Sequence, residues 1–200
     1  VTHLIQKLIK YKEVKANNII DLENYSNTFV FVNGFNKNAI LIDVGCAEDA
    51  DLSVAMMERY SVKCFGVDPT KKHFAALNKL EKKSNGMFTH LPYALGSINE
   101  ELTFFESLDN QSGSLRDDHI NIRNDEINEY KVKCLTIPNL LSIHGISKAD
   151  YFKIDIEGAE YDLISNLKED DLNDINQLFV EFHHRHIPEY SISDTLNCVE

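Results

Sequence analysis

Residues 39–45 carry the stretch AILIDVG, an unbroken apolar run that ends in an acid and a glycine. Continuous apolarity, rather than alternation, is typical of a strand that is buried on both faces of a parallel sheet. Comparable runs follow at residues 62–68 (VKCFGVD) and 151–156 (YFKIDI). Shorter apolar runs predict further strands at residues 29–32, where Asn33-Gly34 predicts a turn, and at 87–91, 102–105, 130–135 and 177–182.

Helical patterns separate these strands. We expect helices at residues 4–9, at 52–60 behind a cap at Asp51, at 70–83 behind Pro69, and between Gly158 and Leu167, with a polar loop at 109–128. Alternating strands and helices predict a doubly wound α/β fold with a mostly parallel sheet. Right-handed crossovers place the carboxyl ends of parallel strands along one edge, and such sheets bind ligands there.

The bulk composition limits the class of protein. Two hundred residues, 43% hydrophobic and 26% charged, suit a single domain over residues 1–200, with a lead-in at 1–38, a core at 39–187 and a C-terminal segment at 188–200. The net charge of −12 disfavours nucleic-acid binding, and no run approaches the roughly 20 apolar residues of a membrane span. Four widely spaced cysteines without a CxxC pair predict reduced thiols in a cytoplasmic protein.

Acids end three of the predicted strands, at Asp43, Asp68 and Asp155. Carboxylates gathered at one edge are costly unless they are solvated or used. Gly45 lets the backbone approach a ligand, although a plain strand-to-helix turn also favours glycine. Asp68 is placed to accept hydrogen bonds from two ribose hydroxyls, or alternatively to balance the dipole of the helix behind Pro69.

The loop after Gly45 selects among ribose-containing cofactors. It reads CAED at residues 46–49, with two acids and no second glycine. A dinucleotide site needs further glycines to admit the pyrophosphate, and acids repel phosphate, so a nucleotide-dependent oxidoreductase is disfavoured. S-adenosylmethionine carries a ribose and an ammonium group but no phosphate, and we expect it as the cofactor.

The most specific string is KIDIEGAE at residues 153–160, which places acids at the end of a core strand. With this string the chain resembles the FkbM family of methyltransferases. The resemblance rests on ordered stretches between Ile40 and His183, which are IDVG (42–45), VDP (67–69), YALG (93–96), LTFF (102–105), SGSL (112–115), VKCLTI (132–137), FKIDIEGAE (152–160) and FVEFH (179–183).

The resemblance implies a Rossmann-like, class I fold and transfer of a methyl group from S-adenosylmethionine to a hydroxyl oxygen. In this family the acceptor is often a sugar or polyketide hydroxyl, so a small-molecule or glycan acceptor is expected, and the oligomeric state stays open. By resemblance Asp43 and Gly45 line the methionine end of the cofactor, Asp68 holds the ribose and Ala94 lies near the adenine. Asp155 and Glu157 face the reacting centre.

Two departures from the family pattern motivate an alternative. Asp49 stands where methyltransferases usually carry a glycine, and its side chain is expected to narrow the pocket or to contact the cofactor's amino group. Few residues follow Pro188, so the C-terminal strand pair of the family fold is expected to be reduced or missing. Both features suit a catalytically silent binding module, and cofactor binding discriminates the two functions.

The histidines near the C-terminus, His183, His184 and His186, suggest a metal site. On a strand His184 and His186 would share a face, but without a nearby Asp or Cys ligand we expect a solvated, partly structural cluster and no metal. Glu181 and His183 would share the other face. The candidates for the base that removes the acceptor proton are therefore Asp155, Glu157, Glu181 and His183.

Overall fold

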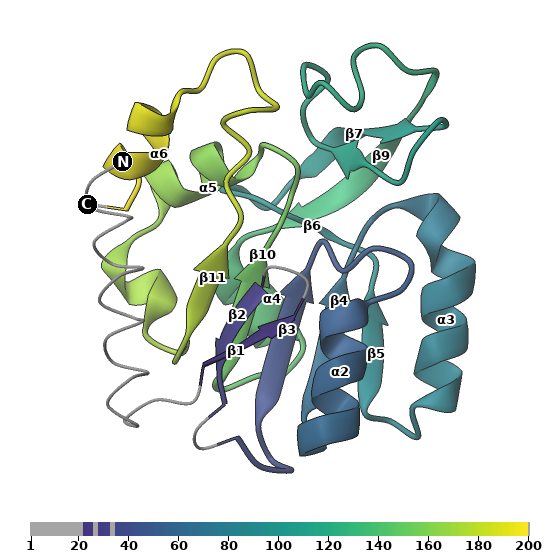
Figure 1. The fold of residues 1–200 in the computed structure, drawn as a ribbon, viewed down its shortest axis with the longest axis vertical. Helices are drawn as coiled ribbons and strands as arrows, with labels where there is room; N and C mark the ends of the chain where they lie inside the picture. The colour runs from purple at the N-terminus through teal and green to yellow at the C-terminus, as the bar shows by residue number, and fades with distance from the viewer. Residues whose placement is uncertain (1–21, 26–27, 33–34, 200) are drawn as a thin grey trace.

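The computed structural model describes residues 22–25, 28–32 and 35–199, so the helix expected at residues 4–9 and the turn at 33–34 lie outside the described residues. Its centre is a parallel sheet of five strands in the order β11-β10-β3-β4-β5 (Figure 1). The strands are β3 (Ile40–Val44), β4 (Lys63–Val67), β5 (Phe88–Leu91), β10 (Tyr151–Ile154) and β11 (Leu178–Val180). The chain moves outward from β3 to β5 and then returns to the other side of β3, so the strand order changes direction between β3 and β10.

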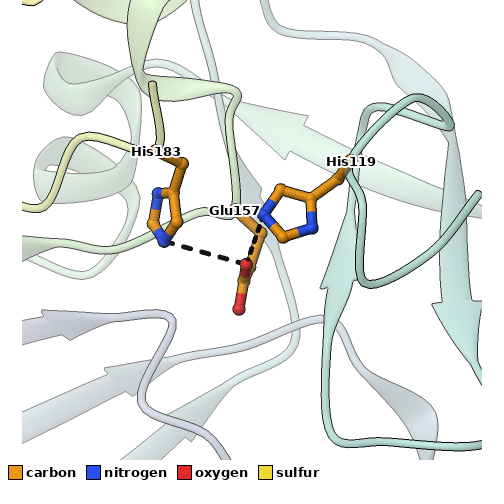
Figure 2. Close-up of side chains that lie close together, drawn as sticks. All are labelled: His119, Glu157 and His183. Carbon is orange, nitrogen blue, oxygen red and sulfur yellow. Dashed lines mark ion pairs between the residues drawn. The ribbon is translucent and has the colours of Figure 1, made fainter. Parts of the chain in front are cut away.

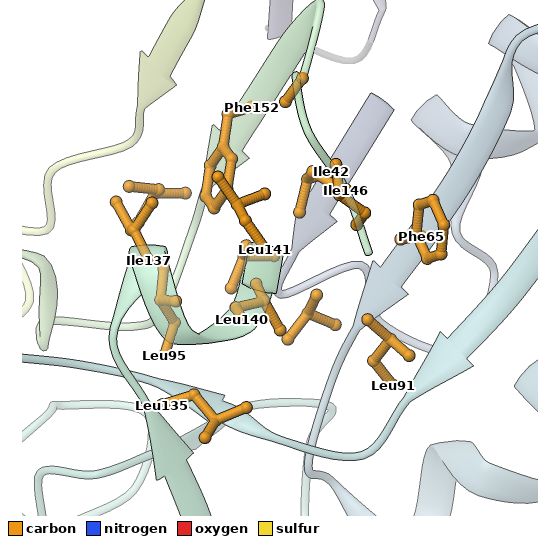
Figure 3. Packing of buried hydrophobic residues seen from close by; sticks show 14 of the residues in the cluster. Ile42, Phe65, Leu91, Leu95, Leu135, Ile137, Leu140, Leu141, Ile146 and Phe152 are labelled. Carbon is orange, nitrogen blue, oxygen red and sulfur yellow. The ribbon is translucent and has the colours of Figure 1, made fainter. Parts of the chain in front are cut away.

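Helices cover both faces of this sheet. They are α2 (Asp51–Tyr60) and α3 (Phe74–Lys83) on one face, and α4 (Ile137–Ile143) and α5 (Glu160–Asn166) on the other. Because side chains alternate along a strand, Ile42 of β3 packs in one cluster with Leu140 of α4 (Figure 3). Leu41 packs in the other cluster, with Met56 of α2. The strands are apolar on both faces for this reason, which confirms the interpretation of residues 39–45.

A second sheet has the order β6-β9-β7-β8, with β6 (Ala94–Leu95), β9 (Ile127–Leu135), β7 (Glu101–Ser107) and β8 (Gly113–Ser114). Strand β7 pairs antiparallel with both β9 and β8. Figure 1 shows β7 and β9 above the five-stranded sheet. The sequence predicts strands at 102–105 and 130–135 correctly, but the separate, largely antiparallel sheet that they form was not expected.

Several local predictions were wrong. Asp51 is the first residue of α2 and makes no cap, because Ala50 precedes it in a left-handed conformation. The helix expected at 70–83 is divided into a 3-10 turn, Lys71–His73, and α3. The polar loop at 109–128 includes β8 and buries His119 completely.

The chain forms further short elements before and after the main strands. A hairpin of β1 (Leu22–Tyr25) and β2 (Thr28–Phe31) precedes the sheet, and a 3-10 turn, Glu169–Leu172, precedes β11. After β11 the described chain, to residue 199, forms α6 (Ile192–Asn197) and no further strand. Within residues 22–25, 28–32 and 35–199, every helix is too short or too polar to cross a bilayer.

Candidate active site

A cavity of about 240 Å³ lies at the carboxyl edge of the parallel sheet, under the second sheet. Its lining joins the ends of β3, β4 and β10 to residues of β6, β7 and β8. The lining residues used below are Gly45, Asp68, Ala94, Ser112, Asp155 and Glu157. The cavity therefore lies where the change in strand order leaves a crevice for a ligand.

Gly45 allows the turn after β3 to pass close to the end of β10. Its φ is +72°, and a Cβ at this position would overlap the carbonyl oxygen of Asp155. Its amide donates to the carbonyl oxygen of Val67 at 2.9 Å, which ties the turn to β4 as well. Any side chain at residue 45 would separate the strand ends that form the floor of the cavity.

Asp68 follows β4 and lines the cavity, with 3% of its surface exposed. Its Oδ2 accepts the amide of Ala47 at 2.9 Å and lies 3.2 Å from Nδ1 of His73, while its Oδ1 accepts the amide of Thr70 at 2.8 Å. Burial acts to raise its pKa, but the contacts with His73 and Thr70 outweigh burial and hold it below the usual value. Asp68 thus fixes two loops of the cavity as well as facing it.

Asp43 is almost fully buried, within β3, and does not line the cavity. It accepts a hydrogen bond from Ser53 of α2 at 2.8 Å, and its Oδ1 lies 3.7 Å from Nζ of Lys153, its register partner on β10. Lys153 also pairs with Asp155 at 3.1 Å. Burial acts to lower the pKa of Lys153, but Asp43 and Asp155 raise it above its usual range, so a buried cation joins the two carboxylates.

Glu157 projects from a tight turn between β10 and α5. Its φ is +52°, an uncommon conformation for a residue with a side chain, and Gly158 follows at +100°. The Ser114 hydroxyl donates to the Glu157 carbonyl oxygen at 2.8 Å, and the Ser112 hydroxyl donates to its carboxylate at 3.3 Å. Strand β8 and this turn therefore hold the carboxylate at the cavity wall, and strained backbone of this kind occurs often at functional sites.

Two imidazole rings approach the same oxygen of Glu157 from opposite sides (Figure 2). Nε2 of His119 lies 2.9 Å from Oε2, and Nε2 of His183 lies 3.7 Å from it. Nδ1 of His183 lies 2.7 Å from Oε1 of Glu160, which also accepts the His183 amide at 2.7 Å. Three segments that are distant in sequence thus meet in one buried group of histidines and carboxylates.

Burial and neighbouring charges shift the pKa values of Asp155, Glu157 and His183 in different directions. Burial raises the pKa of Asp155 to about 6, against the opposing charge of Lys153. Burial also acts to raise the pKa of Glu157, but His119 and His183 outweigh it and hold that pKa below its usual range. Burial acts to lower the pKa of His183, yet Glu160, Glu157 and Asp155 raise it to about 9, so this ring is cationic at neutral pH.

The structure brings together most, but not all, of the residues that the sequence selected. Gly45, Asp68, Ala94, Asp155 and Glu157 line the cavity, whereas Asp43, Glu181 and His183 do not. Glu181 is exposed beyond the end of β11. Asp49 is also exposed and outside the lining, so the expectation that it narrows the pocket was wrong.

The expectation that the C-terminal histidines lie on a strand was also wrong, and His183 belongs to the structural rather than the solvated part of the expected cluster. Strand β11 ends at Val180, the His186 amide bonds the His183 carbonyl in a turn, and His183 is 7% exposed. The sequence analysis missed His119, since a single histidine in a polar stretch has no distinguishing spacing. It also missed the pairing roles of Lys153 and Glu160, although both lie in the KIDIEGAE string.

The fold and the cavity define a class: a mixed α/β protein with a cavity at the carboxyl edge of a parallel sheet. The methyltransferase FkbM domain model matches residues 18–196 of the 200-residue chain. The chain therefore belongs to the FkbM methyltransferase family, which confirms the resemblance and implies a methyl-donor cofactor. No curated protein and no solved structure matches the chain.

Proposed function

We propose that the chain transfers a methyl group from S-adenosylmethionine to a hydroxyl oxygen of a sugar, glycan or polyketide-like acceptor, within a single domain whose core is residues 39–187. The observation that carries this proposal is the charge of the cavity. Three carboxylates, Asp68, Asp155 and Glu157, line it, and its described lining includes no lysine or arginine. Such a wall attracts a cationic ligand and repels phosphates.

The lining suits the parts of this cofactor. Gly45 and the acids at the end of β10 would hold the charged methionine end, and Ala94 with its apolar neighbours Tyr93 and Leu95 would face the adenine. Asp68 would accept hydrogen bonds from the ribose hydroxyls, because its three present contacts do not use all the lone pairs of the carboxylate. Asp43 would act through Lys153 rather than by contact, since it lies behind the lining. When bound, the cofactor supplies a methyl group on a sulfonium centre.

Asp155 is the proposed base for the acceptor hydroxyl. Of the four candidates, only Asp155 and Glu157 line the cavity. Both oxygens of Glu157 have close partners, His119 at 2.9 Å and Ser112 at 3.3 Å. Oδ1 of Asp155 lies 3.5 Å from Nε2 of His183, a separation too long for a strong hydrogen bond, so this oxygen retains capacity to accept a proton.

Cofactor binding is the first test of this function. We expect S-adenosylmethionine and its demethylated product to give a calorimetric isotherm and to raise the melting temperature, while NADH does neither. Binding of NADH with no response to S-adenosylmethionine would refute the proposal. No response to either ligand would favour the silent binding module.

Single-turnover methyl transfer tests the base. With a panel of glycan and polyketide hydroxyl acceptors, Asp155→Asn should slow transfer by about 10²–10⁴-fold, the usual contribution of an acid–base group. Glu181→Gln is the matched control, because Glu181 is exposed and outside the cavity, and its rate should not change. A slow Glu181→Gln variant beside a fast Asp155→Asn variant would assign the base to Glu181.

A further inference from the structure

His119, Glu157 and His183 offer one ligand atom each, and these atoms all lie within 4.8 Å of one another. The two rings are deeply buried, with His119 fully enclosed and His183 7% exposed. Glu157 is half-buried and lines the cavity. Two imidazoles and one carboxylate with one open side form a donor set that binds divalent transition metals in many proteins.

The orientation of His119 points to a ligand rather than to a simple ion pair. Its Nε2 is buried and forms no hydrogen bond among the described residues, although Oε2 of Glu157 is 2.9 Å away. The ring nitrogen is therefore not directed along the line to the carboxylate oxygen. A buried polar atom without a hydrogen bond is costly, and a cation placed between the two atoms would satisfy both.

His183 is oriented as metal-binding histidines usually are. Glu160, with none of its surface exposed, lies 2.7 Å from Nδ1 of His183 and accepts a hydrogen bond from it. A bound ion displaces the proton from Nε2, and the lone pair of Nε2 then lies on the side of Glu157 and Asp155. A carboxylate that fixes the tautomer and the ring orientation in this way is the common outer partner of a metal-bound histidine.

We propose that His119 Nε2, Glu157 Oε2 and His183 Nε2 bind one divalent transition-metal ion, with Zn²⁺, Mn²⁺ and Fe²⁺ as the fitting class. Tetrahedral coordination at 2.0–2.1 Å places ligand atoms about 3.3 Å apart. The two observed separations from Oε2, 2.9 Å and 3.7 Å, lie on either side of that value. The remaining coordination position faces the cavity, because Glu157 forms part of its wall.

Besides loss of the Nε2 proton from His183, coordination requires a rearrangement at His119. The Asn121 amide donates to Nδ1 of His119 at 3.2 Å, so in the present state the proton is on Nε2. In the metal-bound state the proton moves to Nδ1, and the half-buried Asn121 amide turns to solvent. The neighbouring charges favour the ion, since Asp155 and Glu160 adjoin His183 and supply negative charge beyond that of Glu157.

The site differs from the expectation drawn from His183, His184 and His186 alone, because the other two ligands come from the turn after β10 and from the loop after β8. Its role, unlike its existence, rests on the proposed methyl transfer. A bound ion would coordinate the acceptor hydroxyl and lower its pKa, so that its proton passes to Asp155. The oxygen then bonds the methyl carbon as the carbon–sulfur bond breaks, with that electron pair remaining on sulfur.

The test measures metal binding without cofactor or acceptor. The chelator-treated chain is titrated with Co²⁺, with visible absorption as the readout, and with Zn²⁺, with calorimetry and thermal shift as the readouts. We expect one ion per chain, with affinity lost in His119→Ala and His183→Ala and reduced by about 10–100-fold in Glu160→Gln. His144→Ala, at the end of α4, is the control and should bind as the parent does.

Circular dichroism of each variant separates loss of binding from loss of folding, and His119→Gln replaces any alanine variant that does not fold. The proposal is overturned if the folded parent binds no Co²⁺ or Zn²⁺, or if His119→Gln binds as tightly as the parent. Failure of the two proposals is distinguishable: a chain that binds S-adenosylmethionine but no metal loses only the metal site. A chain that binds metal but no S-adenosylmethionine loses only the proposed transfer.

Discussion

Asp68 gives the most direct test of how the cavity is held together. In Asp68→Asn one carboxylate oxygen becomes an NH₂ group, which cannot accept a hydrogen bond. The less costly orientation places NH₂ at the Oδ1 position, because only the Thr70 amide is lost there, whereas Oδ2 contacts both Ala47 and His73. Losing one hydrogen bond to a charged group costs about 1.5–3 kcal/mol.

The remaining contacts also weaken, since hydrogen bonds to an ionised acceptor are roughly twice as strong as neutral ones. We therefore expect the free energy of unfolding to fall by about 2–4 kcal/mol at pH 7. For a domain of this size, a loss of about 3 kcal/mol lowers the melting temperature by roughly 6–12 °C. The measurement is urea unfolding followed by circular dichroism, with Asp117→Asn, an exposed acid, as the control.

The pH dependence gives this prediction a second readout. The folded pKa of Asp68 is lowered, so its contribution is present above the unfolded pKa, near 3.8, and is lost as pH falls through the folded pKa. The stability gap between parent and variant should be constant from about pH 8 to pH 5 and should narrow in stronger acid. A gap at pH 7 no larger than that of Asp117→Asn, or one that does not narrow in acid, would refute this account of Asp68.

Three further substitutions test the surrounding structure. Gly158→Ala should lower the free energy of unfolding by about 1–3 kcal/mol more than Gly86→Ala. Both glycines have positive φ, but only at Gly158 does the new methyl group meet Ile187. Equal losses of stability in urea unfolding would contradict this packing. Lys153→Met should lower the free energy of unfolding by about 3–5 kcal/mol, since it leaves Asp43 and Asp155 without their cation. Lys148→Met, on the surface, should change the stability little. A Lys153→Met variant as stable as the parent would show that the pairing is dispensable. Asp49→Gly should leave calorimetric affinity for S-adenosylmethionine within about twofold, the range of neutral surface changes, and a larger gain would return Asp49 to the cofactor pocket.

The parallel sheet could be predicted because its signal is local. Burial on both faces makes β3, β4 and β10 continuously apolar, and each stretch was identified within one or two residues of its bounds. Strands β6 and β8 have two residues each and no periodicity, and they form through pairing with longer strands. Helix α4 was overlooked although Pro138 stands in its first turn, a common helix-start signal.

The residues of the candidate site also fall into two groups, those that a local sequence signal predicts and those that depend on contacts between distant segments. Gly45, Asp68 and Asp155 follow sheet strands, and the topology alone carries them to a common edge. His119 reaches the site by a different route: the loop between β8 and β9 folds back so that its ring stacks on His186 at 5.2 Å and approaches Glu157. That placement depends on packing between segments almost 40 to 70 residues apart, which no short motif encodes. In the proposed function, the sheet thus places the groups that bind the donor and the base Asp155, whereas His119 and the outer wall of the cavity depend on the loops above the sheet.

Variation in residues 108–126 should therefore change acceptor choice more than donor affinity. Exchanging Gln111, exposed at the mouth of the cavity, tests this division: Gln111→Ala should alter the ranking of acceptors in the transfer panel while leaving the calorimetric affinity for S-adenosylmethionine within about twofold. A loss of donor affinity with an unchanged ranking would show that the loop serves the donor instead.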